Sequence, residues 1–528
     1  MMLDNSVFKP WIPDWFIKVV LMFCMLHSMV LLGVYTSNVT YSASFLDVEI
    51  EDLQFSLSVT YGTFLATILI ESRLFKYFPV RNYFLGIYIL AAFTFILSAY
   101  TDNYVLFIIL RMIEGVLMAL PWIPLRQLLL TRFKSKNATI IVFSFNCATL
   151  LLASPFIMTI AVWFLENYEW KYMAYASAFF QIICVGLVLL TFNGNRFYKK
   201  IPLYQIDWAS FILVYAAILC GCYVFIYGEK KYWFESVQIV LASIIALTTS
   251  GLFIMRQLLV KRPCFDLTVF RYANLRTGFL LFLLFYVARA TLNICHGTMY
   301  SVWGWEPMRV AHVQYINAFG NLIGLTLGGI ALSKAVQMRY IFIIGFLLLA
   351  VYHFWFTFLF VEEVSLWDIA IPYLLQGIAV GMLFVPLILF TVSSVPVNLA
   401  AFSGTVGVTG RFWGSTIGFC IMQNAQIFLQ QSHYSKLQQF VMPESPETQS
   451  RLTNAIQGFV NKGFTADEAH KLAVQGLINT VKKQSMLLSN MEIFTAMGWV
   501  LIALVLFLMV NKHLRQTFDI FKNKVWGS

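Results

Sequence analysis

The stretch LFIILRMIEGVLMALPWIPLRQ, Leu106 to Gln127, is long and apolar enough to cross a membrane, yet it carries two opposite charges. Arg111 and Glu114 stand three residues apart, so a helix places them on one face and within reach of each other. A charge at the centre of a bilayer costs at least about 2.5 to 3.5 kcal/mol. The stretch therefore predicts a membrane-spanning helix whose charged pair has a structural or functional purpose.

The whole chain has the composition of a polytopic membrane protein. It has 528 residues, of which 60% are hydrophobic and 12% are charged, and its mean hydropathy is +0.75. The formal net charge of +11 is dispersed in short clusters between apolar runs, so we do not expect nucleic acid as a partner. The eight cysteines lack metal-type spacing, so neither a metal site nor a disulfide framework is expected, and no motif predicts a cofactor.

Apolar runs recur along the chain and predict fourteen membrane-spanning helices. A helix needs about 20 residues to cross the hydrocarbon. The fold class we expect is therefore an all-α polytopic membrane protein. The predicted spans cover residues 14–35, 55–75, 83–100, 104–128, 138–163, 173–192, 207–227, 236–256, 275–299, 311–334, 339–360, 368–394, 401–427 and 493–511.

Lysines and arginines are concentrated in alternate connections between these spans, and this pattern predicts the topology. Connections rich in positive charge face the cytoplasm. The rule places both termini in the cytoplasm and the protein in the plasma membrane, which is the inner membrane in a Gram-negative cell. The clusters are Arg73, Lys76 and Arg81; Arg132, Lys134 and Lys136; Arg196, Lys199 and Lys200; Lys261, Arg262, Arg271 and Arg276; and Lys512, Arg515, Lys522 and Lys524.

One connection differs from the others because it is long and polar. Between Gln430 and Met486 (residues 430–486) apolar residues recur at helical spacing, and the sequence Thr-Ala-Asp-Glu marks a helix start. Parity places this insert outside the cell. It is interpreted either as a solvated helical hairpin that caps the outer mouth or as a docking surface for a partner that carries cargo onward.

Several motifs occur in a fixed order along the chain. Arg111 and Gly115, followed by Pro121 and Pro124, form an R-x-x-x-G span. Asp207 and Trp208 begin QIDWASFILVYAAILCGCYVFIYGEKKYWFES, a D-W stretch that ends in a G-E-x-x-x-W-F loop, and KRPCFDLTVFRYANLRTG follows it. Near the C-terminus come QGIAVGMLFVPL and GTVGVTGRFWGSTIGFCIMQ, and the latter contains Gly410 and Gly414. Together these motifs resemble the 14-spanner drug:proton antiporter branch of the major facilitator superfamily, the EmrB and QacA type, over almost the whole chain.

The chain also departs from that pattern. In the loop between spans 2 and 3, Lys76 takes the place of an acidic residue and Pro79 that of a glycine. Gly33 stands where span 1 of the family usually carries an aspartate. The glycine-rich motif of span 5 is reduced to ASPFIM, with Ser154 and Pro155. The usual proton-carrying carboxylate is therefore missing from span 1.

The resemblance implies an architecture and a function. The expected parts are an N-terminal six-helix bundle (residues 1–200), an inserted helix pair (201–262) and a C-terminal six-helix bundle (263–528). The implied function is proton-coupled efflux of amphipathic small molecules by alternating access, with multidrug resistance as the consequence. In a host with an outer membrane, the resemblance also implies a periplasmic membrane-fusion adaptor and an outer-membrane channel as partners.

Arg111 and Glu114 are the candidate proton-coupling residues. One reading is a structural ion pair that fixes span 4. The other is a cavity-facing pair whose protonation is coupled to transport, since Glu114 is the best-placed carboxylate deep in the N-terminal bundle once the aspartate of span 1 is lost. Glu71, near the cytoplasmic end of span 2, is instead interpreted as an interfacial partner of Arg73.

Four further ionisable residues are candidates for a substrate cavity. Arg289 and Arg411 lie inside spans without a carboxylate nearby in sequence, so they must face protein, water or cargo. If they line the cavity, the pocket is cationic and aromatic and favours amphipathic anions or weak acids; the alternative is pairing with helix ends or a distant carboxylate. His27 and His296 are candidates because histidine titrates near neutrality, although each can equally be a packing residue.

Other functional classes are weighed against transport. An integral-membrane enzyme would need clustered His, Cys or carboxylate residues or a glycine-rich phosphate loop, and the seven histidines are scattered. A uniporter or importer of an organic anion remains the nearest alternative to an exporter, and a channel or sensor is a further one.

Overall fold

The computed structural model of the chain describes residues 7–35, 39–260, 263–393, 395–396, 399–442 and 444–510. These residues form α-helices joined by short connections, with an isolated β-bridge between Phe8 and Phe192. The candidate charges at Lys261, Arg262 and in the tail beyond Val510 lie outside the described residues.

Thirteen segments of the described chain are long and apolar enough to cross a membrane, which confirms the all-α membrane fold. Three of them are helix pairs with a short break: α1 (Asp14–Met25) with α2 (His27–Gly33), α6 (Tyr104–Ala119) with α7 (Trp122–Leu130), and α12 (Ala273–Arg289) with α13 (Thr291–Ser301). The others are α4 (Ile50–Tyr77), α5 (Val80–Ala99), α8 (Ala138–Asn167), α9 (Trp170–Thr191), α10 (Trp208–Tyr227), α11 (Val237–Leu259), α14 (Pro307–Ser333), α15 (Met338–Thr357), α16 (Leu366–Ser393) and α19 (Ala466–Val510). A short helix, α3 (Val39–Leu46), precedes α4.

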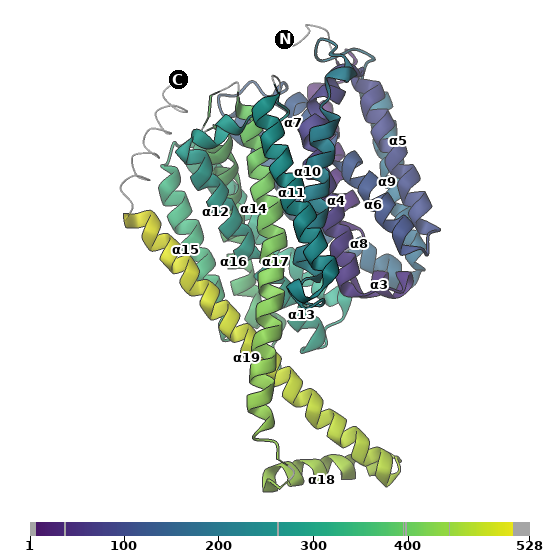
Figure 1. Ribbon diagram of the computed structural model, residues 1–528, viewed down its shortest axis with the longest axis vertical. Coiled ribbons are helices and arrows are strands. Elements are labelled where there is room, and N and C mark those ends of the chain that lie inside the picture. The colour runs from purple at the N-terminus through teal and green to yellow at the C-terminus, as the bar shows by residue number, and fades with distance from the viewer. Residues whose placement is uncertain are drawn as a thin grey trace.

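The remaining predicted span corresponds to α17 (Ala400–Gln438), which is not among the thirteen. This helix runs through the bundle beside the other spans (Figure 1). Its hydropathy is low because glycine, serine and threonine recur along its first half, where the helix packs against α12 and α16. A helix surrounded by protein does not need the apolar surface that lipid requires.

The apolar residues are buried in separate packed clusters. One cluster joins residues between Val7 and Phe197, and a second joins residues between Leu281 and Leu508 together with part of α8. A small third cluster packs the α10–α11 pair against α4 and α17 through residues such as Ile218 and Phe412. The helix pair therefore packs against helices from both halves of the chain. The domain boundaries at residues 200 and 262 stay a prediction.

Glycines allow α14 and α16 to approach closely. A Cβ atom added to Gly320 would collide with the backbone oxygen of Leu374, and one added to Gly324 would collide with that of Ile378. Gly377 and Gly381 of α16 face backbone of α14 in the same way. Such close backbone contact is the usual means by which helices associate in lipid.

The two ends of the bundle can be recognised from backbone contacts. Lys9 donates its backbone N–H to Thr191 at the end of α9 (3.0 Å), and Arg339 at the start of α15 donates its Nε–H to Leu508 near the end of α19 (2.9 Å). We call this the terminal end. The opposite, extension end carries the polar insert.

The polar insert differs from the predicted hairpin over the outer mouth. The α17 helix continues to Gln438, α18 (Pro446–Val460) crosses over, and α19 returns from Ala466 as one helix of 45 residues. Together they form a triangular extension that points away from the bundle (Figure 1). Of the two interpretations, a cap lying over the bundle is not what the structure shows, because α17 and α19 continue out of the bundle as unbroken helices.

Candidate functional site

A cavity of about 470 Å³ lies between helices from the two halves of the chain, and we call it the Arg411 cavity. Its walls come from α4, α7 and α8 on one side and from α12, α16 and α17 on the other. Connecting segments near Gln205 and Pro263, at the terminal end, line its mouth. Its ionisable lining residues are Glu71, Arg73, Arg126, Asp207, Cys264 and Arg411.

Arg411 links the two halves of the chain across this cavity. Its side chain is 8% exposed, and its Nε–H donates to the hydroxyl of Tyr61 on α4. The guanidinium also lies 5.9 Å from the ring centroid of Trp122 on α7, within the range of a cation–π contact. The structure thus places this candidate residue on the wall of a cavity, held by aromatic groups.

Glu71 is a cavity residue that the sequence analysis placed wrongly. Its side chain is 1% exposed and lines the Arg411 cavity, and it interacts electrostatically with Lys76 and with Arg126. Its Oε2 atom has no hydrogen-bond partner among the described residues. Arg73 donates to Oε1 of Gln205 instead (3.0 Å). The interfacial Glu71–Arg73 pair is therefore wrong, because α4 continues to Tyr77 and Glu71 lies inside the bundle.

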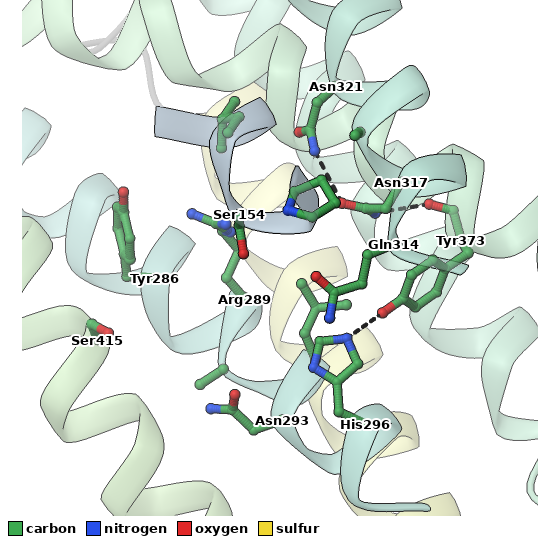
Figure 2. Close-up of a pocket in the computed structure, with 15 residues that line it drawn as sticks. Ser154, Tyr286, Arg289, Asn293, His296, Gln314, Asn317, Asn321, Tyr373 and Ser415 are labelled. Carbon is green, nitrogen blue, oxygen red and sulfur yellow. Dashed lines mark hydrogen bonds between the residues drawn. The ribbon is translucent and has the colours of Figure 1, made fainter. Parts of the chain in front are cut away.

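A second cavity of about 260 Å³, the Arg289 cavity, is lined by the residues drawn in Figure 2. Ser154 and Pro155 of α8 face residues of α12, α13, α14, α16 and α17 across it. His296 shares a hydrogen bond of 2.6 Å with the hydroxyl of Tyr373. Asn317 donates to the backbone oxygen of Tyr373 (2.9 Å) and accepts a hydrogen bond from Asn321 (3.0 Å). Most of the lining is polar, so the cavity suits a hydrogen-bonding group.

Arg289 is the charged residue of this second cavity. The lining residues include no carboxylate, and the guanidinium lies 5.5 Å from the ring centroid of Tyr286. His296 and Arg289 reach the cavity from consecutive helices, α13 and α12, on either side of the break at Ala290. The site is therefore cationic and aromatic, and it can attract an anion more readily than a cation.

Arg111 and Glu114 lie inside the N-terminal helices and away from the walls of both cavities. Both side chains are fully buried and form an ion pair. Arg111 also donates to the backbone oxygens of Leu31 (2.7 Å) and Leu32 (3.2 Å), at the carboxyl end of α2. One carboxylate oxygen of Glu114 has no hydrogen-bond partner among the described residues. The expected cavity-facing position is not found; the pair instead ties α6 to the end of α2.

His27 is also placed within packed helices. Its Nδ1 lies 2.6 Å from Oε1 of Gln181, and its Nε2 lies 3.2 Å from the backbone oxygen of Leu117. The ring is fully buried and makes an edge contact with Tyr88. These contacts satisfy the imidazole without a ligand, and His27 lines neither of the two cavities.

Three of the motif glycines pack helices together. A Cβ atom at Gly115 would collide with the backbone oxygen of Thr60, so Gly115 lets α6 contact α4. Gly414 faces Leu283 of α12, where an added Cβ would lie 3.1 Å from its Cα, and Gly410 faces the ring of Phe279 in the same way. Because Gly410 and Gly414 have no side chain, α17 can pack closely against α12. These two helices carry Arg411 and Arg289.

The prolines and the D-W pair shape helix ends. Pro121 precedes α7 and breaks it from α6, whereas Pro155 lies inside α8 at the Arg289 cavity. Asp207 caps α10 by accepting from the backbone N–H of Ser210 (3.2 Å), and it forms an ion pair with Arg256 (2.9 Å). Burial opposes the charge of Asp207, but the bonds from Arg256 and Ser210 outweigh it and lower the pKa of this carboxyl. Trp208 is half exposed.

Curated proteins with similar sequences include multidrug export proteins. The chain is 24% identical over 406 residues to the multidrug export protein EmrB of Haemophilus influenzae, covering 74% of this chain and 77% of that protein. It is 24% identical to EmrB of Escherichia coli strain K12, over 73% of each chain, and 23% identical to the fatty acid resistance protein FarB of Neisseria gonorrhoeae, over 75% of this chain and 76% of FarB. No family model matches the chain.

Solved structures with the same fold are transporters. A POT family transporter in complex with 5-aminolevulinic acid aligns with a TM-score of 0.59, at 13% identity, over 96% of both chains. A POT family transporter in complex with a thioalcohol-conjugated peptide aligns with a TM-score of 0.57, at 13% identity, over 78% of this chain and 91% of that one. At this identity the likeness concerns the fold.

Proposed function

We propose that this chain, a homologue of the EmrB-type exporters of the major facilitator superfamily, is a proton-coupled exporter of amphipathic small molecules that works by alternating access. The observation that carries the proposal is the Arg411 cavity, which lies between the two halves of the chain and has its mouth at the terminal end. Rocking of one half against the other would expose such a site to each side of the membrane in turn. An enzymatic role has no support among the relatives, of which the two EmrB proteins are named as multidrug export proteins.

The cargo we propose is an amphipathic anion or weak acid. Arg289 lies in a cavity whose lining has no carboxylate, and Arg411 lines the neighbouring one. A guanidinium can bind a carboxylate or sulfonate head group through charge-assisted hydrogen bonds. The name of the relative FarB, a fatty acid resistance protein, agrees with this class. Import or uniport of an organic anion is the second candidate, because the same cationic walls would serve it.

The experiment that tests the cargo class is uptake into proteoliposomes of matched anionic, neutral and cationic amphiphiles. We expect the anion to be transported best, and we expect Arg289→Gln to reduce its apparent affinity at least about tenfold, the usual loss when a charged hydrogen bond is removed. The neutral analogue serves as the control and should be little affected. Preference for the cation would contradict the proposed cargo.

We propose two carboxylates for proton coupling. Arg111 pairs with Glu114 and also donates to the end of α2. A movement of α2 would therefore change the position of Arg111 relative to the carboxylate of Glu114. Glu71 is the second candidate, since it lies on the wall of the Arg411 cavity and one of its oxygens has no hydrogen-bond partner in the described part of the chain. The two differ in position, and separate substitutions can therefore distinguish them.

We propose that the terminal end faces the cytoplasm, so that the extension lies outside. In a host with an outer membrane, the extension would bind a membrane-fusion adaptor that leads to an outer-membrane channel. Exposed apolar side chains at Phe440, Met442 and Phe464 support a protein contact there. Replacing these three by serine should abolish cross-linking to the adaptor while leaving the bundle folded. Unchanged cross-linking and export would contradict the role of the extension.

A further inference from the structure

A third cavity, of about 300 Å³, opens beside the Arg411 cavity, and we call it the lateral pocket. Its lining comes from α4, α10, α11, α12 and α17 and from the segment before α12, in the half of the bundle nearest the terminal end. The side chains are almost entirely apolar, with Phe253, Phe279 and Trp413 among them. Ile254 and Phe270 at its edge are 48% and 39% exposed, so the pocket opens on the lipid-facing surface.

The lateral pocket and the Arg411 cavity share part of their walls. Leu69 of α4 and Thr405 of α17 line both. One face of α17 lines the Arg411 cavity with Gly404, Gly407 and Arg411. Another face of the same helix lines the lateral pocket with Val406, Thr409 and Trp413. An added Cβ at Gly404 would meet nothing within 4 Å. The partition between the polar cavity and the apolar pocket is therefore thin.

The charge of the Arg411 cavity suits an anionic head group close to this partition. Arg411 and Arg126 line the cavity from opposite halves of the chain, and the lining residues include three arginines against two carboxylates, Glu71 and Asp207. Arg73 and Asp207, nearer the mouth, are engaged by Gln205 and Arg256. Arg411 lies six residues from Thr405 on the same helix, which is about 9 Å along the helix axis. A long alkyl chain can extend over that distance.

We propose that the Arg411 cavity and the lateral pocket form one binding site for a long-chain anionic amphiphile. Its head group lies between Arg126 and Arg411, and its apolar tail passes between Leu69 and Thr405 into the lateral pocket. The site gives the α10–α11 pair a function, because this pair closes the outer side of the pocket. The proposal rests on the proposed function only in the class of cargo; this site is separate from the Arg289 cavity, and the membrane is the route by which the tail enters it.

Photo-labelling of the purified chain in lipid nanodiscs tests this site without any transport. The probe is a long-chain alkyl carboxylate with a diazirine at the end of the tail, and its methyl ester is the control for the head group. We expect labelling near Phe253, Phe279 and Trp413 that excess unlabelled carboxylate suppresses. The ester should label these residues at least about tenfold less, because it lacks the charge that Arg126 and Arg411 bind.

A substitution at the partition provides a second measurement. Thr405→Trp fills the gap between Leu69 and Thr405. Labelling of the lateral pocket should then fall about tenfold, because several methylene groups of the probe's tail are no longer buried there. Leu241→Trp, on the exposed face of α11, is the matched control and should leave labelling unchanged. Mapping on the unsubstituted chain decides the proposal even if Thr405→Trp does not fold.

Three results would overturn the proposal: suppressible labelling confined to the walls of the Arg411 cavity, equal labelling by ester and carboxylate, or full labelling of a folded Thr405→Trp variant. Equal labelling by the ester would mean that the pocket holds lipid tails. A chain that binds the probe as expected but transports nothing would contradict the proposed function and leave the site intact.

Discussion

Buried charges divide into those that hold helices together and those that face a cavity. Arg111 pairs with Glu114 and donates to the end of α2, whereas Arg289 lies in a cavity without a carboxylate among its lining residues. A charge without a protein partner is costly in a membrane unless water or a ligand reaches it. This difference is why we assign Arg289 to cargo and Arg111 to the coupling machinery.

The first prediction distinguishes the two carboxylates proposed for coupling. Glu114→Gln and Glu71→Gln each keep the size and hydrogen bonding of the side chain but remove its titration. The variant of the coupling residue should bind cargo nearly as well as the unsubstituted chain and lose the dependence of transport on the pH gradient. Transport at a series of gradients, together with equilibrium cargo binding, measures both effects. Full gradient dependence in both variants would place the coupling group elsewhere.

Part of the site could be predicted from the sequence, because a charge inside a membrane span is costly and therefore calls for an explanation. Arg289, Arg411 and His296 line cavities as their position inside spans suggested. Glu71 was missed because its depth depends on where α4 ends and on its neighbours from α7, which no local pattern reports. His27 occupies a similar sequence context, yet Gln181, distant in the chain, satisfies it.

At the scale of helices, apolar runs locate the spans but not their interruptions. The breaks at Leu26 and Ala290 fall in continuous apolar or mixed sequence, and only Pro121 marks a break by its chemistry. The sequence predicts two spans and a separate insert, whereas the structure has the continuous helices α17 and α19. The difference arises because hydropathy changes at the membrane surface while helical periodicity does not. Such boundaries follow from the lipid surface and from tertiary packing.

The second prediction concerns the contact between α14 and α16. Gly324→Ala places a methyl group against the backbone of Ile378, so the helices must move apart, at a cost of about 1 to 3 kcal/mol. The thermal unfolding midpoint of the purified chain should fall clearly. Gly186→Ala on α9, where an added Cβ meets nothing within 4 Å, is the control and should change little. Equal midpoints for both variants would contradict the packing role.

The third prediction concerns the cap of α10. Because the pKa of Asp207 is lower in the folded chain, its contribution to stability is present above its unfolded value of 3.8 and is lost as pH falls through the folded pKa. Asp207→Ala should destabilise the chain by about 1 kcal/mol at neutral pH. The difference in unfolding midpoint should stay constant down to about pH 4 and shrink below it. A difference that already shrinks near pH 6 would point to another titrating group.

At the scale of the whole molecule, the two halves of the chain enclose the charged cavities, and the α10–α11 pair and the extension add separate surfaces. Arg411 of α17 contacts Tyr61 and Trp122 across the interface between the halves, and α8 packs against α14 there as well. The close backbone contacts between α14 and α16 lie within one half. Rocking of one half against the other would keep the α14–α16 contact and would change the contacts of Arg411 and those between α8 and α14.

The most direct test of this account is accumulation of a labelled alkyl carboxylate in proteoliposomes whose lumen is more acidic than the medium. A permeant weak acid leaves an acidic lumen passively, so only exchange for outgoing protons can concentrate it there. We predict accumulation above the outside concentration that collapses when a protonophore dissipates the gradient and that Arg289→Gln strongly reduces. Equilibration without accumulation, insensitive to the gradient, would contradict proton-coupled export and indicate a uniporter.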